Sequence, residues 1–248
     1  MVTTGVVFRP QSPPEELRAA VEAAEAAGIA ELWLWEDCFL EGGLTTAAAA
    51  LAWSDRIAVG IGLLPVPFRN PALAAMELAT LARLFPGRLT VALGHGVQDW
   101  MRQVGAAVES PMTLLREHTS AVRALLHGDV VDVRGRYVSL DRVRLDWPPS
   151  RPPRLLVGGR GPRTVGLAGE VADGVLLDSV TDPDVVRRAR EAVGTAHVAA
   201  YTPVEPGTSP DALRAWVAEL ADAGADTVVV HGTDDHPHHA TLIDALGS

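Results

Sequence analysis

Three short segments of the chain place titratable or flexible residues directly after an apolar run. Glu36 and Asp37 follow "ELWLW", and His95 stands between two glycines in "LGHG". The segment "LLVGGRGPR" brings glycines and arginines together in the same way. Carboxylates and histidine transfer protons near neutral pH when their surroundings tune them, and glycine-rich turns with arginine bind anions. Asp37, Glu36 and His95 are therefore candidate acid–base residues, and a structural role is the alternative for the lone His95.

The glycine-rich segment is the strongest of these local signals. Pro162 begins a predicted helix directly after it, and the free N–H groups and dipole of a helix N-terminus attract an anion. Glycine lets the backbone approach a ligand closely, and arginine adds bidentate charge. A phosphate site is therefore predicted at Gly158, Gly159, Arg160, Gly161 and Arg163. A plain glycine-rich turn without a ligand is the alternative.

An apolar wall is predicted where the third strand ends, in "VGIGLLPVPF". The run after Gly62 is apolar, and the two prolines that follow hold the chain extended. A flat aromatic ring could rest on this wall, and a core strand followed by a rigid loop is the alternative. The histidines at 236, 238 and 239 have no carboxylate or cysteine beside them that completes a ligand set. We predict no metal site there, only a solvated helix start.

Strand and helix patterns alternate along the whole chain, which indicates an α/β fold. Strands that are apolar on both faces are typical of parallel sheets covered by helices. A (β/α)8 barrel of one domain, residues 1–248, is predicted, and an open doubly wound sheet is the alternative. Two short runs around Arg134 and Gly135 predict a hairpin inserted between strands four and five. The eight predicted strands begin near Thr4, Ile29, Arg56, Gly87, Arg154, Gly174, Ala196 and Asp226.

The carboxyl ends of the strands form the catalytic face of such a barrel. Glu36, Asp37, His95 and the glycine-rich turn all follow strands, so the fold would bring them to one rim. Arg9, Asp178 and Tyr201 lie at the ends of other predicted strands. The opposite ends carry mainly arginine, alanine and glycine.

Composition excludes several classes of function. The net charge of −10 argues against nucleic-acid binding. All 21 basic residues are arginine, which excludes lysine Schiff-base chemistry and Walker-type P-loops. The single cysteine rules out an internal disulfide. Without an apolar run of about 18 residues or a signal-like N-terminus, we predict no membrane association and a cytoplasmic location.

Together these segments resemble the luciferase-like monooxygenase superfamily, specifically its branch that uses the deazaflavin coenzyme F420. "LWLWEDCF" is similar to the second-strand signature, and "GIGLLPVPFRNPALAAMELATLARLFPGRLTVALGHG" to the block of strands three and four. "PPRLLVGGRGPRTVGLAGEVADGVLLD" is similar to the phosphate loop and the "ADG" that follows. The pieces occur in the family's order over nearly the whole chain, so the set is specific.

The resemblance implies where a cofactor would lie. The ring would rest on strand three, against a bulge with a cis peptide bond at Gly62–Leu63, and the phosphate would bind at Gly159, Arg160 and Gly161. Related enzymes often carry Asp-His after strand two, where this chain has Glu36 and Asp37. They also place a carboxylate or amide after strand four, where Val97 and Gln98 stand here. The full set of cofactor-binding residues implied is Gly62, Leu63, Leu64, Gly94, His95, Gly96, Gly158, Gly159, Arg160, Gly161 and Arg163.

The activity implied is hydride transfer between C5 of F420 and a small organic substrate, with Asp37, Glu36 or His95 as the proton-transferring group. If Asp37 works near neutral pH, burial beside Trp35 and Phe39 must raise its pKa. An FMN-dependent monooxygenase of the same superfamily is one alternative. Others are a cofactor-free phosphate-binding lyase or isomerase and a non-catalytic cofactor-binding barrel. A homodimer is also expected, with Trp33, Trp53 and the helix around Leu114 as candidate contacts.

Overall fold

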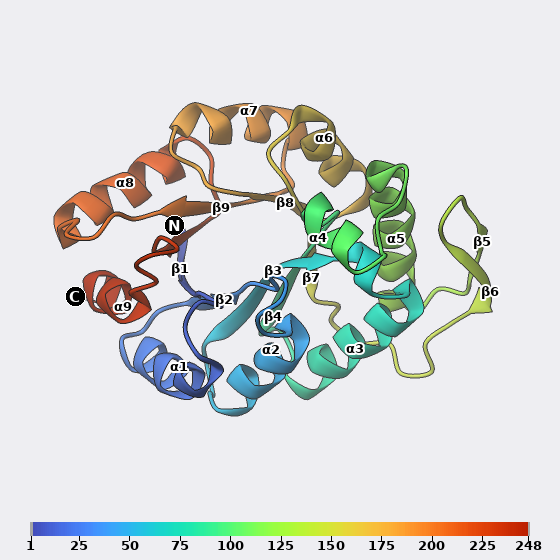
Figure 1. Cartoon of the computed structure of the whole chain (residues 1–248), viewed down its shortest axis with the longest axis horizontal. Coiled ribbons are helices and arrows are strands. Elements are labelled where there is room, and N and C mark those ends of the chain that lie inside the picture. The colour runs from blue at the N-terminus through green and yellow to red at the C-terminus, as the bar shows by residue number, and fades with distance from the viewer. Residues whose placement is uncertain (1, 248) are drawn as a thin grey trace.

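The computed structural model describes residues 2–247 and shows a closed barrel of eight parallel strands surrounded by helices (Figure 1). Each barrel strand pairs with its two neighbours in the order β1-β10-β9-β8-β7-β4-β3-β2. The predicted (β/α)8 barrel is confirmed, and the open sheet is excluded. The barrel strands are β1 (Thr3–Phe8), β2 (Glu31–Leu34), β3 (Ala58–Pro65), β4 (Leu89–Gly94), β7 (Arg154–Gly158), β8 (Gly174–Leu177), β9 (His197–Pro203) and β10 (Thr227–His231).

Helices cover the outside of the barrel, and most begin at a proline. Pro71, Pro111, Pro162, Pro183 and Pro210 each occupy the first turn, where the missing N–H costs no hydrogen bond. No helix within residues 2–247 has the length and apolar character to cross a membrane. The helices are α1 (Leu17–Ala26), α2 (Gly43–Ala52), α3 (Pro71–Leu84), α4 (Gln98–Gln103), α5 (Pro111–Leu126), α6 (Pro162–Val171), α7 (Pro183–Val193), α8 (Pro210–Asp222) and α9 (His239–Gly247), with short 3-10 turns at Pro14–Glu16 and Val66–Phe68.

The predicted hairpin is confirmed as a two-stranded antiparallel sheet of β5 (Val131–Arg134) and β6 (Ser139–Val143). It projects from the barrel beside α5 (Figure 1). Two local features differ from the sequence prediction. Strand β2 ends at Leu34, so Trp35 already belongs to the loop, and the short helix α4 was not predicted. Helix α4 has six residues and buries only Met101. This pattern is too short for helical periodicity to show in the sequence.

The barrel interior is built around Trp33, which is 1% exposed. Its indole N–H donates to the Glu31 carboxylate at 2.7 Å. A Cβ atom on Gly60 of the neighbouring strand would lie 2.1 Å from the indole ring, and one on Gly5 would lie 3.1 Å from it. Glycine on both flanking strands therefore provides the space that this side chain occupies.

The buried position of Trp33 corrects one expectation about assembly. A side chain enclosed by the barrel cannot reach a second subunit. Trp53, which follows α2 and is 40% exposed, remains a candidate contact, and so does α5, which buries Leu114 but exposes Arg116, Ser120 and Arg123. The homodimer itself stays a prediction.

We predict that Gly60→Ala lowers the free energy of unfolding by about 1–3 kcal/mol, because the added methyl group must displace the Trp33 ring. Gly166→Ala is the matched control. Gly166 lies within α6 with open space around its Cβ position, so the change is expected to be neutral or to stabilise by up to about 1 kcal/mol. Urea denaturation measures both. A Gly60→Ala protein as stable as wild type would contradict the packing described for Trp33.

Candidate active site

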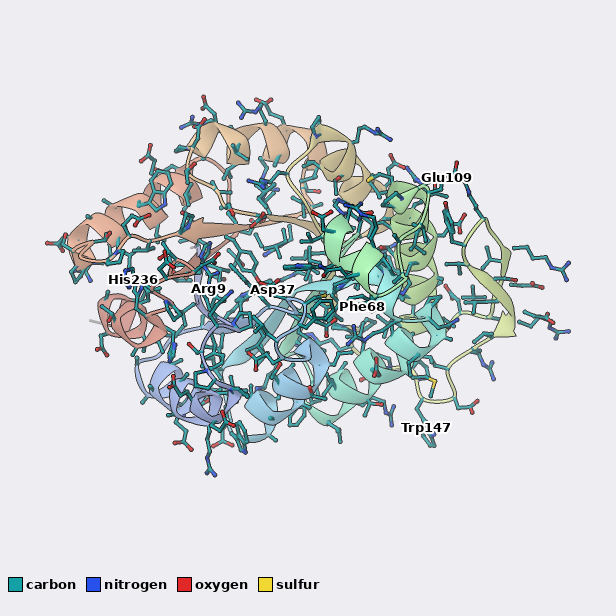
Figure 2. All side chains as sticks on the ribbon, viewed as in Figure 1. Arg9, Asp37, Phe68, Glu109, Trp147 and His236 are labelled. Carbon is teal, nitrogen blue, oxygen red and sulfur yellow. The ribbon has the colours of Figure 1, made fainter. Side chains whose placement is uncertain are left out.

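A cavity of about 710 Å³ opens at the carboxyl ends of the barrel strands. Figure 2 shows Asp37 near the middle of the barrel, whereas Trp147 lies at the outer edge of the molecule. The lining comes from the ends of β3, β7, β8 and β9, from the loops after β2, β4, β7 and β8, and from the helices α4 and α6. It consists of Trp35, Glu36, Asp37, Gly62, Leu63, Pro65, His95, Gly96, Val97, Gln98, Trp100, Gly158, Gly159, Arg160, Gly161, Thr164, Leu176, Asp178 and Tyr201.

One wall of the cavity is a bulge in β3. Gly62 pairs with Ala92 and Leu64 pairs with Leu93, so Leu63 is the extra residue on this strand. The peptide bond between Gly62 and Leu63 is cis, which confirms the geometry that the family resemblance implied. The bulge turns Leu63 toward the cavity and leaves an apolar surface there.

Two glycines make room for the Leu63 side chain. A Cβ atom on Gly94 would lie 2.4 Å from Leu63 Cδ2, and one on Gly158 would lie 2.7 Å from the same atom. Gly94 therefore shapes the wall from behind without lining the cavity. Next to it, Gly96 has φ +70°, a left-handed conformation that glycine adopts without strain.

The glycine-rich turn forms another side of the cavity, between β7 and α6. Gly159, Arg160 and Gly161 line it, together with Thr164 from the first turn of the helix. A Cβ atom on Gly159 would lie 2.6 Å from Thr164 Cγ2, so only glycine lets the turn fold this closely onto the helix. Arg160 lies 3.6 Å from Asp178 and is largely exposed, so its guanidinium remains accessible to an anion. Pro162 has no N–H, and the N–H groups of Thr164 and Val165 donate to the Gly161 carbonyl at 3.0 Å. The backbone donors left for such an anion are therefore those of Arg160, Gly161 and Arg163.

Asp37 is the cavity carboxyl whose chemistry is most altered by its surroundings. Burial raises its pKa, nearby Asp234 and Asp178 raise it further, and Arg9 partly opposes the rise. The direction expected from the sequence is confirmed. Phe39 contributes little to that burial, because it is 64% exposed.

Glu36 lines the cavity, but its carboxylate is held by neighbours. Arg69 donates to both oxygens, at 2.5 and 2.8 Å, and the backbone N–H of Gly43 donates at 2.8 Å. Gly43 is the first residue of α2, so the carboxylate also lies at the N-terminus of that helix. This arrangement anchors the loop that carries Asp37. It gives Glu36 a structural role and leaves Asp37 as the stronger acid–base candidate.

His95 lines the cavity as predicted, in the turn after β4. Its Nδ1 lies 3.0 Å from the carbonyl oxygen of Gly96. A carbonyl can only accept, so Nδ1 carries the proton, and Nε2 is the nitrogen left to act as an acceptor in the neutral ring. The side-chain amide of Gln98 donates to the carbonyls of His95 and Gly96, at 3.0 and 3.2 Å, and fixes the turn.

Three predicted cofactor-binding residues do not line the cavity: Gly94, which lies behind Leu63, and Leu64 and Arg163. Leu64 is 2% exposed and packs between the barrel and its helices, because the bulge directs Leu63 and not Leu64 into the cavity. Arg163 is exposed on α6 and does not line the cavity. The binding role of the remaining predicted residues stays a prediction.

Several lining residues were missed by sequence reasoning. Asp178 directly follows β8, and Tyr201 lies in β9. Both strands end at this rim, so the sequence indicated the position of these residues, but we assigned them no role. Trp35, Trp100, Thr164 and Leu176 carried no signal, because apolar and small residues at such positions look like ordinary packing.

Comparisons with known proteins agree with this architecture. A sequence profile described as luciferase-like monooxygenase matches residues 2–208. The chain belongs to the luciferase-like monooxygenase family. A solved structure of a coenzyme F420-dependent tetrahydromethanopterin reductase from Methanopyrus kandleri superposes with a TM-score of 0.85, over 100% of this chain and 97% of that one, at 18% identity. At this identity the similarity shows the fold shared within the luciferase-like family.

Two sequence relatives carry functional names. A 5,10-methylenetetrahydromethanopterin reductase from Methanolobus tindarius is 26% identical over 204 residues, which are 82% of this chain and 62% of the relative. An F420-dependent glucose-6-phosphate dehydrogenase from Microbacterium testaceum is 29% identical over 160 residues, which are 62% of this chain and 47% of the relative. This luciferase-like chain thus spans less than two thirds of the length of these relatives.

We predict that Glu36→Gln lowers the free energy of unfolding by about 1–3 kcal/mol, because it removes the buried carboxylate that Arg69 bonds through both terminal nitrogens and leaves only the more exposed Glu77, 3.5 Å from Arg69 Nε, as a counter-charge. The control is Glu22→Gln, which removes an exposed i,i+4 pair with Arg18 and is expected to cost less than about 0.5 kcal/mol. Urea denaturation gives both values. A Glu36→Gln protein of wild-type stability would contradict the anchoring role.

Proposed function

We propose that this luciferase-like protein is an F420-dependent oxidoreductase that transfers hydride to or from a small organic substrate. The observation that carries the proposal is the arrangement of the cavity: an apolar bulge of β3 on one side and a glycine–arginine turn at a helix N-terminus on another. F420, when bound, supplies a reactive C5 position for hydride transfer. The F420 named among the sequence relatives supports the choice of cofactor.

The residues present fit such a cofactor. Gly94 and Gly158 leave space that a Cβ atom would fill, so that Leu63 lies flat against the strands and offers an apolar face to a planar ring. Arg160 and Gly161 would hold the phosphate through their backbone N–H groups and the Arg160 guanidinium. Gly159, whose own N–H donates to the Leu176 carbonyl at 3.0 Å, would let the phosphate approach the turn closely. These two contact regions would fix the cofactor at both ends and orient it for reaction.

In this proposal Asp37 holds the proton that accompanies hydride transfer. Its raised pKa keeps a larger fraction of the carboxyl protonated at a given pH than an exposed aspartate would have. His95 is the second candidate, through Nε2. Glu36 supports the loop, since its oxygens are already paired with Arg69 and Gly43.

The direct test of the cofactor is titration of the purified protein with F420 and, separately, with FMN, followed by fluorescence. The proposal expects saturable binding of F420. Binding of FMN without binding of F420 would instead identify an FMN-dependent monooxygenase. Binding of neither would favour a cofactor-free barrel and contradict the proposal.

We predict that Arg160→Gln weakens F420 binding about 5- to 30-fold, as expected for loss of a charge-assisted hydrogen bond worth about 1–2 kcal/mol. Arg163→Gln is the matched control, because Arg163 lies three residues further on, outside the cavity lining. It is expected to bind F420 like wild type. Equal losses in the two variants would show that the turn attracts the cofactor by general charge and not by the contact proposed for Arg160.

We predict that Asp37→Asn abolishes turnover and leaves F420 affinity within about 2-fold of wild type. In the direction that reduces substrate, wild-type turnover should fall as pH rises through the raised pKa of Asp37, because the acid form is lost. Asp132→Asn, a change on the exposed hairpin, should leave the pH–rate profile unchanged. Turnover that persists in Asp37→Asn with the same profile would remove Asp37 from the chemistry.

The same raised pKa has a consequence for stability, measured by urea denaturation across pH. The folded protein binds the Asp37 proton more tightly than the unfolded chain does, so this group contributes less stability as pH rises from the unfolded pKa through the raised folded pKa. The Asp37→Asn variant does not lose stability in this way, because asparagine does not titrate. We therefore expect the variant to be at least as stable as wild type at neutral pH, and a clear loss of stability would indicate that the carboxylate is instead held by favourable contacts.

A further inference from the structure

Tyr201 reaches across the barrel from β9 to the bulge of β3. Its hydroxyl donates to the carbonyl oxygen of Gly62 at 3.2 Å, between residues 139 positions apart in the chain. The side chain is 3% exposed and lines the floor of the cavity. A Cβ atom on Gly62 would lie 2.2 Å from this hydroxyl, so glycine at 62 is what allows the approach.

Aromatic neighbours hold the Tyr201 ring in this orientation. Trp33 packs beneath it with ring centroids 5.5 Å apart and near-perpendicular planes, and Trp35 lies at 5.5 Å on another side. The ring of His231 lies 6.2 Å away, also near-perpendicular. Edge-to-face contacts of this kind are directional, so they restrict the directions in which the hydroxyl can point.

The Tyr201 hydroxyl meets the Gly62 carbonyl as an O–H donor, because a carbonyl oxygen can only accept. Burial raises the pKa of Tyr201 well above its ordinary value, so the phenol keeps its proton to a higher pH than an exposed tyrosine would. The contact lies in a buried setting where an unpaired carbonyl is costly.

The register of the sheet explains why the Gly62 carbonyl matters. The ladder between β3 and β4 shifts between Gly62 and Leu64, and a bulge disrupts regular pairing at the inserted residue. A cross-barrel donor at this point fixes the position of the bulge relative to β9. It thereby fixes the surface of Leu63 that faces the cavity.

We propose that Tyr201 is a positioning residue for the cofactor ring, acting through the Gly62 carbonyl to hold the Leu63 surface in place. This inference rests on the proposed function, since it assumes that a flavin or deazaflavin ring occupies that surface. Tyr201 acts on the bound ring through the backbone of Gly62 and Leu63. It does not itself transfer a proton, because its hydroxyl hydrogen is already donated to the Gly62 carbonyl.

The chain contains only two tyrosines, which provides a matched control. The hydroxyl of Tyr137 accepts from the backbone N–H of Ser110 at 2.9 Å, away from the cavity lining. Tyr201→Phe and Tyr137→Phe each remove one oxygen from a partly or fully buried hydrogen bond. The two variants therefore carry comparable changes in composition and differ in their place relative to the proposed ring.

The test is titration of wild type and both variants with F420, followed by fluorescence. The expected result is about 3- to 10-fold weaker binding by Tyr201→Phe, the effect of one net hydrogen bond, and unchanged binding by Tyr137→Phe. Wild-type affinity in Tyr201→Phe, with or without a loss of thermal stability, would overturn the proposal and leave Tyr201 a packing residue. An equal loss of affinity in both variants would overturn it as well.

A second measurement detects whether F420 binding affects Tyr201, and it does not depend on affinity. In protein labelled with carbon-13 at tyrosine Cζ, two resonances are expected, and each variant assigns one of them. Saturation with F420 should shift the Tyr201 resonance and leave the Tyr137 resonance in place. Binding of F420 with no shift at Tyr201 would overturn the proposal. Failure of wild type to bind F420 or FMN would instead contradict the proposed function, which separates the two failures.

Discussion

The cavity depends on one steric constraint: large side chains cross the top of the barrel only where the facing strands carry no Cβ atom. Gly60 admits Trp33, Gly62 admits the Tyr201 hydroxyl, and Gly94 and Gly158 admit Leu63. Barrel interiors are packed and not hollow, so a ligand cavity must be opened by choosing which side chains are large. Here Leu63 from β3 forms a wall and Tyr201 from β9 the floor, with Trp33 from β2 packed beneath it, and glycines on other strands accommodate all three.

Different surroundings give different roles to the two adjacent carboxylates, Glu36 and Asp37. Glu36 accepts hydrogen bonds from Arg69 and Gly43 and anchors the loop to α2. Asp37 is one residue further, desolvated and close to two other aspartates, and burial raises its pKa. The hydrogen bonds to an arginine and a helix N-terminus give Glu36 a structural role. Asp37 lacks these hydrogen bonds and is desolvated, which leaves it available for proton transfer.

Sequence patterns predicted the barrel, the hairpin and the rim on which the site lies, because strand and helix periodicity and strand-end residues are local properties. They placed Leu64 and Arg163 in the site, and the structure does not. The inserted residue of a bulge reverses which of two consecutive leucines faces the cavity, and the outward direction of Arg163 depends on how α6 packs. The Glu36–Arg69 pair and the Tyr201–Gly62 hydrogen bond join residues far apart in the chain, so no local pattern could reveal them.

We propose that a cofactor binds with its ring on the Leu63 surface and its phosphate at the start of α6. A crystal structure of the protein with F420 bound tests this claim most directly. We expect the ring against Gly62 and Leu63, the phosphate within hydrogen-bonding distance of the backbone N–H groups of Arg160 and Gly161, and Tyr201 still bonded to Gly62. A ring bound elsewhere on the barrel, or a phosphate held away from α6, would contradict it.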